Sequence, residues 1–173
     1  FDLSQDPFRT SDVSYFHKSL GGYNAAKLRR YNDVIDYYLK NGNGNVASML
    51  NAKYYIQRDA QGRKIAERNE FALGNAWFVD RLQFVRSDQE EIDQLGKINP
   101  RNTAVIHNDF AGELGGITPR SNGQIKLTKY SPDELIYQYN SPQSNVAVFS
   151  EVWYGPDKGW QAYIDGEPVE HIR

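Results

Sequence analysis

The order of hydrophobic and polar residues divides the 173-residue chain into a helical first third and a β-rich remainder. Between Tyr23 and Lys40, apolar side chains recur at intervals of three and four residues, the pattern of an amphipathic helix. Gly21-Gly22 precedes this helix, and "NGNG" at 41–44 ends it with residues that accept the left-handed conformation. A short second helix is expected at Val46–Asn51. The first twenty residues mix isolated aromatics with turn-forming residues and are predicted to form an extended arm.

Beyond residue 52 the pattern changes to short strands separated by Pro, Gly and Asp turns. In "QIKLTKY" at 124–130, Ile125 and Leu127 alternate with polar residues, and Asp165-Gly166 predicts a two-residue hairpin turn. Ser87, three residues before Glu90, predicts a capped helix that ends near Gly96. The predicted strands are Ala52–Gln57, Lys64–Arg68, Ala76–Val85, Thr103–His107, Gln124–Tyr130, Glu134–Asn140, Asn145–Tyr154 and the two arms of the last hairpin.

Strands at this spacing are typical of an antiparallel β-sandwich or jelly roll. We therefore expect an α+β fold in which N-terminal helices pack on a jelly-roll-like antiparallel sheet. The length suits one domain with its own core. Residues 1–173 are accordingly predicted to be a single domain, with the arm and helices at 1–60 and mostly β-structure at 61–173.

Composition excludes several functional classes. The formal net charge of -2 disfavours a nucleic-acid-binding protein, and no apolar run approaches the roughly 18 residues that span a bilayer. The first residues have neither the basic start nor the apolar centre of a signal peptide. The absence of cysteine excludes disulfides, thiolate catalysis and thiolate metal sites.

No motif for catalysis or cofactor binding stands out, so we predict no catalytic residue, no metal ligand and no cofactor. The three histidines, His17, His107 and His171, have no partner at metal-ligand spacing. Nucleophile-elbow, phosphate-loop and dinucleotide-binding patterns are absent from the sequence. Glu90 and Glu91 are neighbours on a predicted helix and do not face each other, whereas glycoside hydrolysis needs two converging carboxylates.

Aromatic residues make up 13 % of the chain and suggest where a ligand binds. Tyr and Trp suit half-buried strand surfaces, and they also line sugar-binding surfaces. In "SYFHKSLGGY" at 14–23, aromatic and basic residues lead into the predicted helix. An alternative is that this arm only packs across the sheet. The candidate binding residues are Tyr15, His17, Lys18, Tyr23, Lys27 and Arg30.

Four stretches together resemble one family. They are "RTSDVSYFHKSLGGYNAAKLRRYNDVIDYYL" (9–39), "MLNAKYYI" (49–56), "ALGNAWFVDRLQFV" (72–85) and "VFSEVWYGPDKGWQAYIDGEPVEHIR" (148–173). They are similar, in this order and over nearly the whole chain, to YfhO-type bacterial membrane proteins, especially those of Bacteroidetes. The resemblance implies a large multi-pass envelope protein similar to membrane glycosyltransferases that use lipid-linked sugar donors.

The resemblance also implies a position within that protein. The matching part lies toward the C-terminal side, on the extracytoplasmic (periplasmic) face of the cell membrane, whereas the transfer chemistry belongs to the membrane portion. No catalytic residue of the family has a counterpart here, so we expect this segment to be non-catalytic alone and the parent protein to be the candidate enzyme. Its expected partners are the membrane portion of its own parent chain and an envelope glycan or lipid-linked sugar.

The end of the chain carries a related expectation. Sequence 159–173 stops on the returning arm of a hairpin, so we expect an excised piece of a larger membrane protein. Val169–Arg173 is expected to pair as an edge strand with Trp160–Ile164 or to fray. Two other functions stay open: a free-standing carbohydrate-binding or adhesive β-sandwich, and a hydrolase on a sandwich scaffold.

Overall fold

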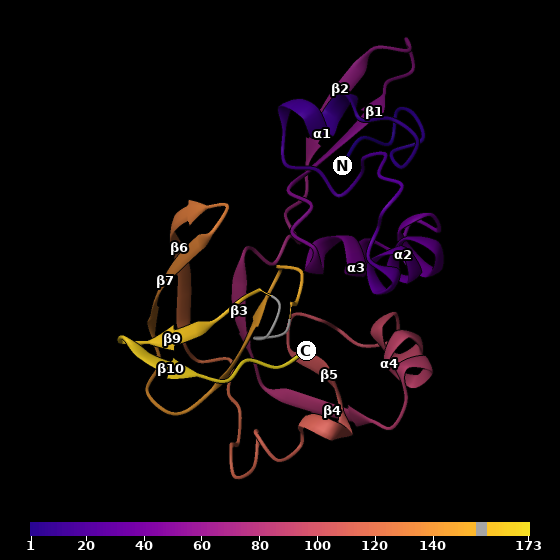
Figure 1. Ribbon diagram of the computed structural model, residues 1–173. Helices are drawn as coiled ribbons and strands as arrows, with labels where there is room; N and C mark the ends of the chain where they lie inside the picture. Colours follow the sequence, from indigo (N-terminus) through magenta and orange to yellow (C-terminus); the bar gives the residue numbers. More distant parts are fainter. Residues whose placement is uncertain (155–158) are drawn as a thin grey trace. The chain divides into compact units, whose positions relative to one another are not determined.

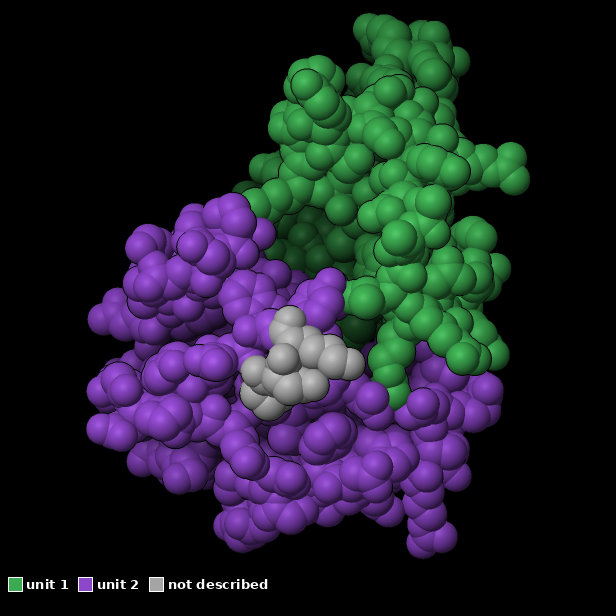
Figure 2. Space-filling model, in the orientation of Figure 1, with its two compact units in different colours: residues 1–74 green, residues 75–173 purple. Residues whose placement is uncertain are grey.

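The computed structural model of the protein describes residues 1–154 and 159–173 (Figure 1). It contains helices and strands in mixture, so the predicted α+β class is confirmed. The chain divides into two compact units, residues 1–74 and residues 75–173 (Figure 2). The helices are α1 (Asp12–Phe16), α2 (Arg29–Val34), the π-helix η1 (Ile35–Leu39), α3 (Gly44–Met49), α4 (Asp88–Leu95) and the 3-10 turn η2 (Asn108–Phe110).

The strands of the described residues pair two by two. Four of these sheets are antiparallel, and the β4–β5 pair is parallel, so a single antiparallel sandwich sheet is not what the strand pairing shows. The strands are β1 (Tyr54–Arg58), β2 (Lys64–Arg68), β3 (Ala76–Val79), β4 (Arg81–Val85), β5 (Thr103–His107), β6 (Gln124–Ser131), β7 (Glu134–Asn140), β8 (Val146–Phe149), β9 (Ala162–Ile164) and β10 (Glu167–Val169).

In unit 1, the main helix begins at Arg29, six residues later than predicted, and runs from α2 directly into η1. The delay has a local cause, because the Asn24 side chain accepts a hydrogen bond from the Ala26 amide at 2.9 Å and holds this segment in a turn. Ile35 and Leu39 then bury one face of the helix. The helix ends as predicted at "NGNG", where Gly42 takes a φ of +70° and the Asn43 side chain caps α3.

The first residues of the chain lie beside the β1–β2 hairpin rather than projecting freely. The Leu3 amide donates to the Ile56 carbonyl at 2.7 Å, and the Ile56 amide donates to the Phe1 carbonyl at 2.9 Å. This places residues 1–3 parallel to β1. The predicted arm also contains one turn of helix that was not expected: in α1 the Tyr15 amide donates to the Ser11 carbonyl at 2.9 Å.

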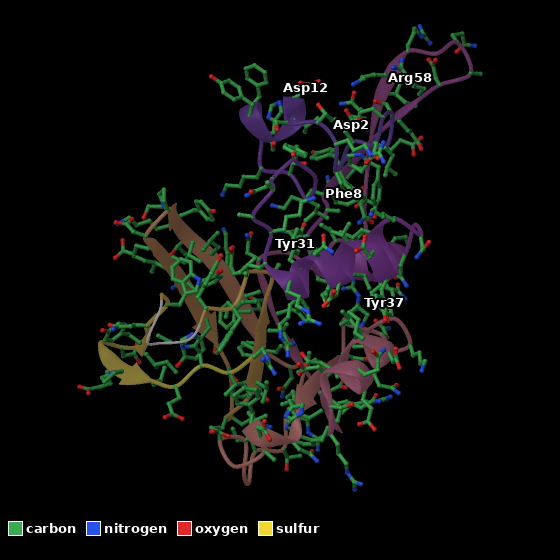
Figure 3. The ribbon with its side chains drawn as sticks, turned by 45° about the vertical axis from the view of Figure 1, so that its right-hand side comes forward. Asp2, Phe8, Asp12, Tyr31, Tyr37 and Arg58 are labelled. Carbon is green, nitrogen blue, oxygen red and sulfur yellow. The ribbon has the colours of Figure 1, made fainter. Side chains whose placement is uncertain are left out.

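Asp2 is the buried charge that fixes this N-terminal segment (labelled in Figure 3). Its carboxylate accepts hydrogen bonds from the Ser4 amide and hydroxyl at 2.8 and 2.6 Å, and from the Lys64 ammonium on β2 at 3.1 Å. Burial by itself raises the pKa of the Asp2 carboxyl, but the bonds from Ser4 and Lys64 outweigh burial and hold that pKa below its ordinary value.

In unit 2, the predicted strand at 76–85 is broken at Asp80. The amides of Asp80 and Arg81 both donate to the Asn102 carbonyl at 3.0 Å, and at this point the chain changes its partner from β8 to β5. Beyond the break, β4, α4 and β5 form a βαβ unit whose two strands pair in parallel. Its helix is capped as predicted, since the Ser87 hydroxyl accepts from the Glu90 amide at 3.1 Å.

The β6–β7 and β9–β10 hairpins lie on the other side of β3 from β4, α4 and β5 in Figure 1. Strand β8 ends at Phe149 instead of the predicted Tyr154, because its partner β3 begins at Ala76, which pairs with Phe149. The last hairpin turns at Asp165-Gly166 as predicted, with φ of +52° and +89°. Of the returning arm expected at Val169–Arg173, only Val169 pairs, with Ala162, and β10 ends there.

Gly123 sets the approach of the β6–β7 hairpin to β3, and it generates a test. A Cβ at this position would lie 2.7 Å from the ring of Phe78, which is buried, and 2.9 Å from the main-chain carbonyl oxygen of Asn140. We expect Gly123→Ala to lower the free energy of unfolding of unit 2 by about 1–3 kcal/mol. All three Trp residues (77, 153 and 160) lie in unit 2, so urea denaturation followed by tryptophan fluorescence measures this change.

The matched control is Gly112→Ala, because a Cβ at Gly112 meets nothing within 4 Å. This variant is expected to stay within about 0.5 kcal/mol of the original chain. Equal losses in the two variants would contradict the role given to Gly123.

Asp2 predicts a pH dependence for unit 1. A carboxyl whose pKa is lowered on folding adds stability above its unfolded pKa, and this stability is lost as pH falls through the folded pKa. Asp2→Asn is therefore expected to cost about 1–3 kcal/mol at neutral pH. The cost should shrink toward zero in acid, below the unfolded value of about 4. Urea denaturation followed by circular dichroism at both pH values measures the difference.

Glu67→Gln, a change of an exposed carboxylate on β2 of the same hairpin, is the control and is expected to be nearly neutral at both pH values. A cost for Asp2→Asn that does not change with pH would show that the charge of Asp2 is not what stabilises the segment.

Candidate functional site

A hollow of about 520 Å³ lies beside the terminal hairpin of unit 2, and we call it the hairpin groove. Its lining comes from three separate parts of the sequence: the region of η2, the segment after β8, and the hairpin with the residues that follow it. The lining residues are Phe110, Glu113, Trp153, Gln161, Ala162, Tyr163, Pro168, Val169, Glu170, His171 and Ile172.

Short-range interactions define the β9–β10 hairpin. Asp165 and Gly166 supply the two positive φ angles that a tight turn needs, so that Tyr163 pairs with Pro168 across the strands. The Tyr163 hydroxyl donates to the Gln161 side-chain oxygen at 2.9 Å, which holds the phenol against the amide of its own strand. An aromatic face and an amide are thereby fixed next to each other at the groove.

Arg173 holds the segment after β10 in place, so residues 170–173 neither continue the strand nor fray. Its guanidinium lies 5.7 Å from the centre of the Phe110 ring and 5.9 Å from that of Trp153, within cation–π range of both. The same group is 3.5 Å from an Asp88 carboxylate oxygen and 3.9 Å from one of Glu91. The end of the described chain is thus tied to the first turn of α4.

His171 belongs to the same aromatic cluster. Its ring centre is 6.4 Å from that of Trp153, and its Nε2 is 3.2 Å from the Tyr154 carbonyl oxygen. The main-chain carbonyl at that distance favours the tautomer in which Nε2 carries the proton and donates it. His171 therefore orients Trp153 and the backbone beside it.

The groove combines aromatic faces with acceptors at its edge. Phe110, Trp153 and Tyr163 supply the rings, and Glu113 and Glu170 supply carboxylates. Such a lining is chemically suited to a molecule with flat apolar faces and many hydroxyl donors at its edges, because rings cover apolar faces while carboxylates accept from hydroxyls.

The residues predicted from the sequence as a binding surface all lie in unit 1, away from the sequence segments that form the groove. Tyr15 and Tyr23 are exposed, as are His17, which ends α1, and Lys18, which follows it. Arg30 is exposed in the first turn of α2. The Lys27 ammonium lies 5.6 Å from the centre of the buried Phe8 ring.

Backbone contacts close the loop that carries Tyr15, His17 and Lys18. The Tyr23 amide donates to the Thr10 carbonyl at 3.1 Å, and Gly22 lies against Ser14 of α1. Lys27 has a structural contact with Phe8, so its stem covers part of the unit 1 core. Whether the six residues bind a ligand stays a prediction.

The hairpin groove was not predicted from the sequence. Its residues are spread between positions 110 and 172, and no local spacing links Phe110 to Trp153 or to Tyr163. The available signal was the density of aromatic residues in "VWY" at 152–154 and "GWQAY" at 159–163. That density alone does not reveal which rings share a surface.

A second hollow of unit 2 is polar. It has a volume of about 380 Å³ and is lined by Asp80, Arg81, Arg120, Ser121 and Asn122. Asp80 accepts a hydrogen bond from the Ser121 hydroxyl at 3.3 Å and lies 3.6 Å from the Arg81 guanidinium. One carboxylate oxygen of Asp80 accepts no hydrogen bond, but the lining contains no aromatic ring, so the hairpin groove is the stronger candidate.

Within residues 1–154 and 159–173, no group of three or more His, Asp or Glu side chains is placed to hold a metal ion. In the same residues, no helix has both the length and the apolar character that crossing a membrane requires. Comparisons with models of protein families, with curated proteins and with solved structures find no match to this chain.

Arg173 provides a test of how the groove is held together. We expect Arg173→Ala to cost about 1–2 kcal/mol in the local stability of the hairpin, because two ring contacts and the contacts with α4 are lost together. Hydrogen exchange of the β9 and β10 amides measures this change.

Arg173→Lys separates charge from shape, since an ammonium keeps the charge but loses the planar stacking group. It is expected to recover only part of the protection. Arg101→Ala, at an exposed position of the same unit, is the control. Unchanged protection in Arg173→Ala would contradict the anchoring role.

Proposed function

We propose that this chain is the extracytoplasmic, glycan-contacting domain of a bacterial envelope protein similar to the YfhO-type membrane proteins, and that it is non-catalytic by itself. The observation that supports glycan contact most directly is the hairpin groove, where Phe110, Trp153 and Tyr163 lie with Glu113 and Glu170. In the same proposal, the β3–β8 and β6–β7 sheets form a sandwich-like part of unit 2. The two sheets meet where Gly123 contacts Phe78.

A sugar ring suits this groove for physical reasons. Its C–H faces are apolar and flat, while its hydroxyls donate and accept hydrogen bonds around the edge. Trp153 and Tyr163 keep 37 % and 58 % of their surfaces exposed, so their rings remain available for stacking although they line a hollow. Glu113 and Glu170 are acceptors for hydroxyl donors, and the Gln161 amide adds a donor.

In this proposal the groove lies on the extracytoplasmic side, where the membrane portion of the parent protein is its partner. There the domain would orient an acceptor or a lipid-linked sugar, while the transfer step belongs to the membrane part. The flanking coding sequence tests this part of the proposal: hydrophobic helices upstream and one after Arg173 are expected. A free-standing carbohydrate-binding or adhesive module would use the same groove without those helices.

A hydrolase is the second candidate function, and it rests on the presence of Glu113 and Glu170 in one hollow. Retaining and inverting glycosidases both need two carboxylates that flank the bond to be cleaved. A hydrolase would release a reducing end from a bound glycan, and Glu113→Gln would abolish that release. Under the glycan-contacting proposal, no release is expected from the original chain.

Glycan-array binding followed by titration of the best glycan tests the proposed site. We expect Trp153→Ala and Tyr163→Ala each to weaken the affinity roughly tenfold, because each removes one stacking face. Tyr54→Ala in unit 1 removes a Tyr of similar exposure, 53 %, and is expected to bind as the original chain does.

Two further variants separate the groove from the surface predicted by the sequence. Tyr15→Ala and Tyr23→Ala lie outside the groove and are expected to leave glycan affinity unchanged. If these two variants lose affinity while Trp153→Ala retains it, the glycan site belongs to unit 1. Absence of binding to any glycan would refute the proposed function.

A further inference from the structure

We propose that the loop from Pro7 to Tyr23 docks the chain on an anionic lipid surface, with the rings of Tyr15 and Phe16 entering the interface. This inference concerns unit 1 and does not depend on the hairpin groove. It rests on three observations: a loop tied at its base, two exposed rings at its tip, and a local excess of basic residues.

The loop is a compact projection because its base is closed. The Gly22 amide donates to the Pro7 carbonyl at 2.7 Å, and the Tyr23 amide donates to the Thr10 carbonyl at 3.1 Å. A Cβ at Gly21 would lie only 2.3 Å from the Pro7 oxygen, so glycine is required for this approach. Helix α1 lies in the sequence between these two tied segments. It begins at Asp12, which is labelled in Figure 3.

The rings lie on α1 and contribute little to the core. Tyr15 and Phe16 expose 82 % and 75 % of their surfaces, and their rings pack edge to face with centres 4.9 Å apart. The buried apolar residues of unit 1 come from other positions, such as Phe8, Ile35 and Val46. Two adjacent exposed rings of this size are therefore not explained by folding and mark a contact surface.

The charge of the sequence that contains the rings points to the kind of surface. The loop itself, residues 7–23, contains two basic residues and one acidic residue, and three more basic residues follow it at 27–30, so residues 7–30 have a net charge of +4 within a chain of net charge -2. The basic residues are Arg9, Lys18, Lys27, Arg29 and Arg30. Aromatic side chains next to Lys and Arg are the composition of segments that bind the headgroup region of anionic membranes.

Two other occupants fit less well. A second copy of the chain would bring a segment of the same +4 charge against this one, and like charges repel. A glycan would need a hollow to bury its faces, whereas these rings protrude edge to face from a short helix. An anionic bilayer supplies both the opposite charge and an apolar layer that accepts the rings.

Vesicle binding of the 173-residue chain tests the proposal. Because the chain has no cysteine, Phe16→Cys and Phe71→Cys each accept a single environment-sensitive fluorophore. Phe71 is the matched control, since it is 74 % exposed in the same unit but follows an acidic residue, Glu70. With phosphatidylglycerol vesicles, the label at position 16 is expected to shift to the blue and brighten, whereas the label at position 71 is not.

Unlabelled variants measure the contribution of the rings. Tyr15→Ser combined with Phe16→Ser is expected to weaken partitioning into phosphatidylglycerol vesicles about tenfold or more, and Phe71→Ser is expected to change it less than twofold. Binding should fall in high salt and with pure phosphatidylcholine, because the charge attraction is screened or absent. Circular dichroism confirms that each variant is folded.

Three results would overturn the proposal. The first is no binding of the original chain to phosphatidylglycerol vesicles, and the second is equal binding by the double Ser variant. The third is a dimer in sedimentation experiments that the double Ser variant abolishes while vesicle binding persists, which would assign the rings to a second copy of the chain.

Discussion

The main-chain carbonyl of Asn102, which accepts hydrogen bonds from the amides of both Asp80 and Arg81, determines how unit 2 is arranged. At this point the chain leaves β8 and takes β5 as its partner. The parallel pairing that follows requires a crossover, and α4 supplies it. The first turn of α4 in turn places Asp88 and Glu91 where Arg173 reaches them, and Arg173 lies over two rings of the hairpin groove. The groove thus depends on a bond formed far away in sequence.

The sequence predicted what short-range chemistry decides. Strands β2, β5 and β7 have the expected bounds, the Ser87 cap and the Asp165-Gly166 turn formed, and the helices surround "NGNG" as expected. The sequence-based prediction failed where the bounds of a strand depend on the strand with which it pairs. The charged pair Asp80-Arg81 interrupts the apolar residues at 76–85, but nothing local shows that both amides bond to Asn102, more than twenty residues away. The end of β8 at Phe149 likewise follows from where β3 starts.

The candidate sites differ in the same way. The surface on residues 15–30 is contiguous in sequence, so alternating aromatic and basic residues were sufficient to suggest it. The hairpin groove assembles side chains from positions 110–113, 153 and 161–172, and only the fold brings them together. Aromatic content shows only that rings are plentiful. The burial of each ring in the fold decides whether it packs in the core or can contact a ligand. Burial raises the pKa of Tyr31 to about 12 while its hydroxyl donates to the Leu20 carbonyl at 2.7 Å, whereas Tyr15 stays exposed.

The distribution of charge separates the two units more sharply than the net charge suggests. Residues 1–74 contain eleven basic and eight acidic residues, a net charge of +3, whereas residues 75–173 contain nine basic and fourteen acidic residues, a net charge of -5. An anionic lipid surface therefore attracts unit 1 and repels unit 2. The groove, with Glu113 and Glu170 in its lining, favours a ligand that is neutral or rich in hydroxyl donors over an anionic one. Under the two proposals, each surface thus lies in the unit whose charge suits its proposed ligand.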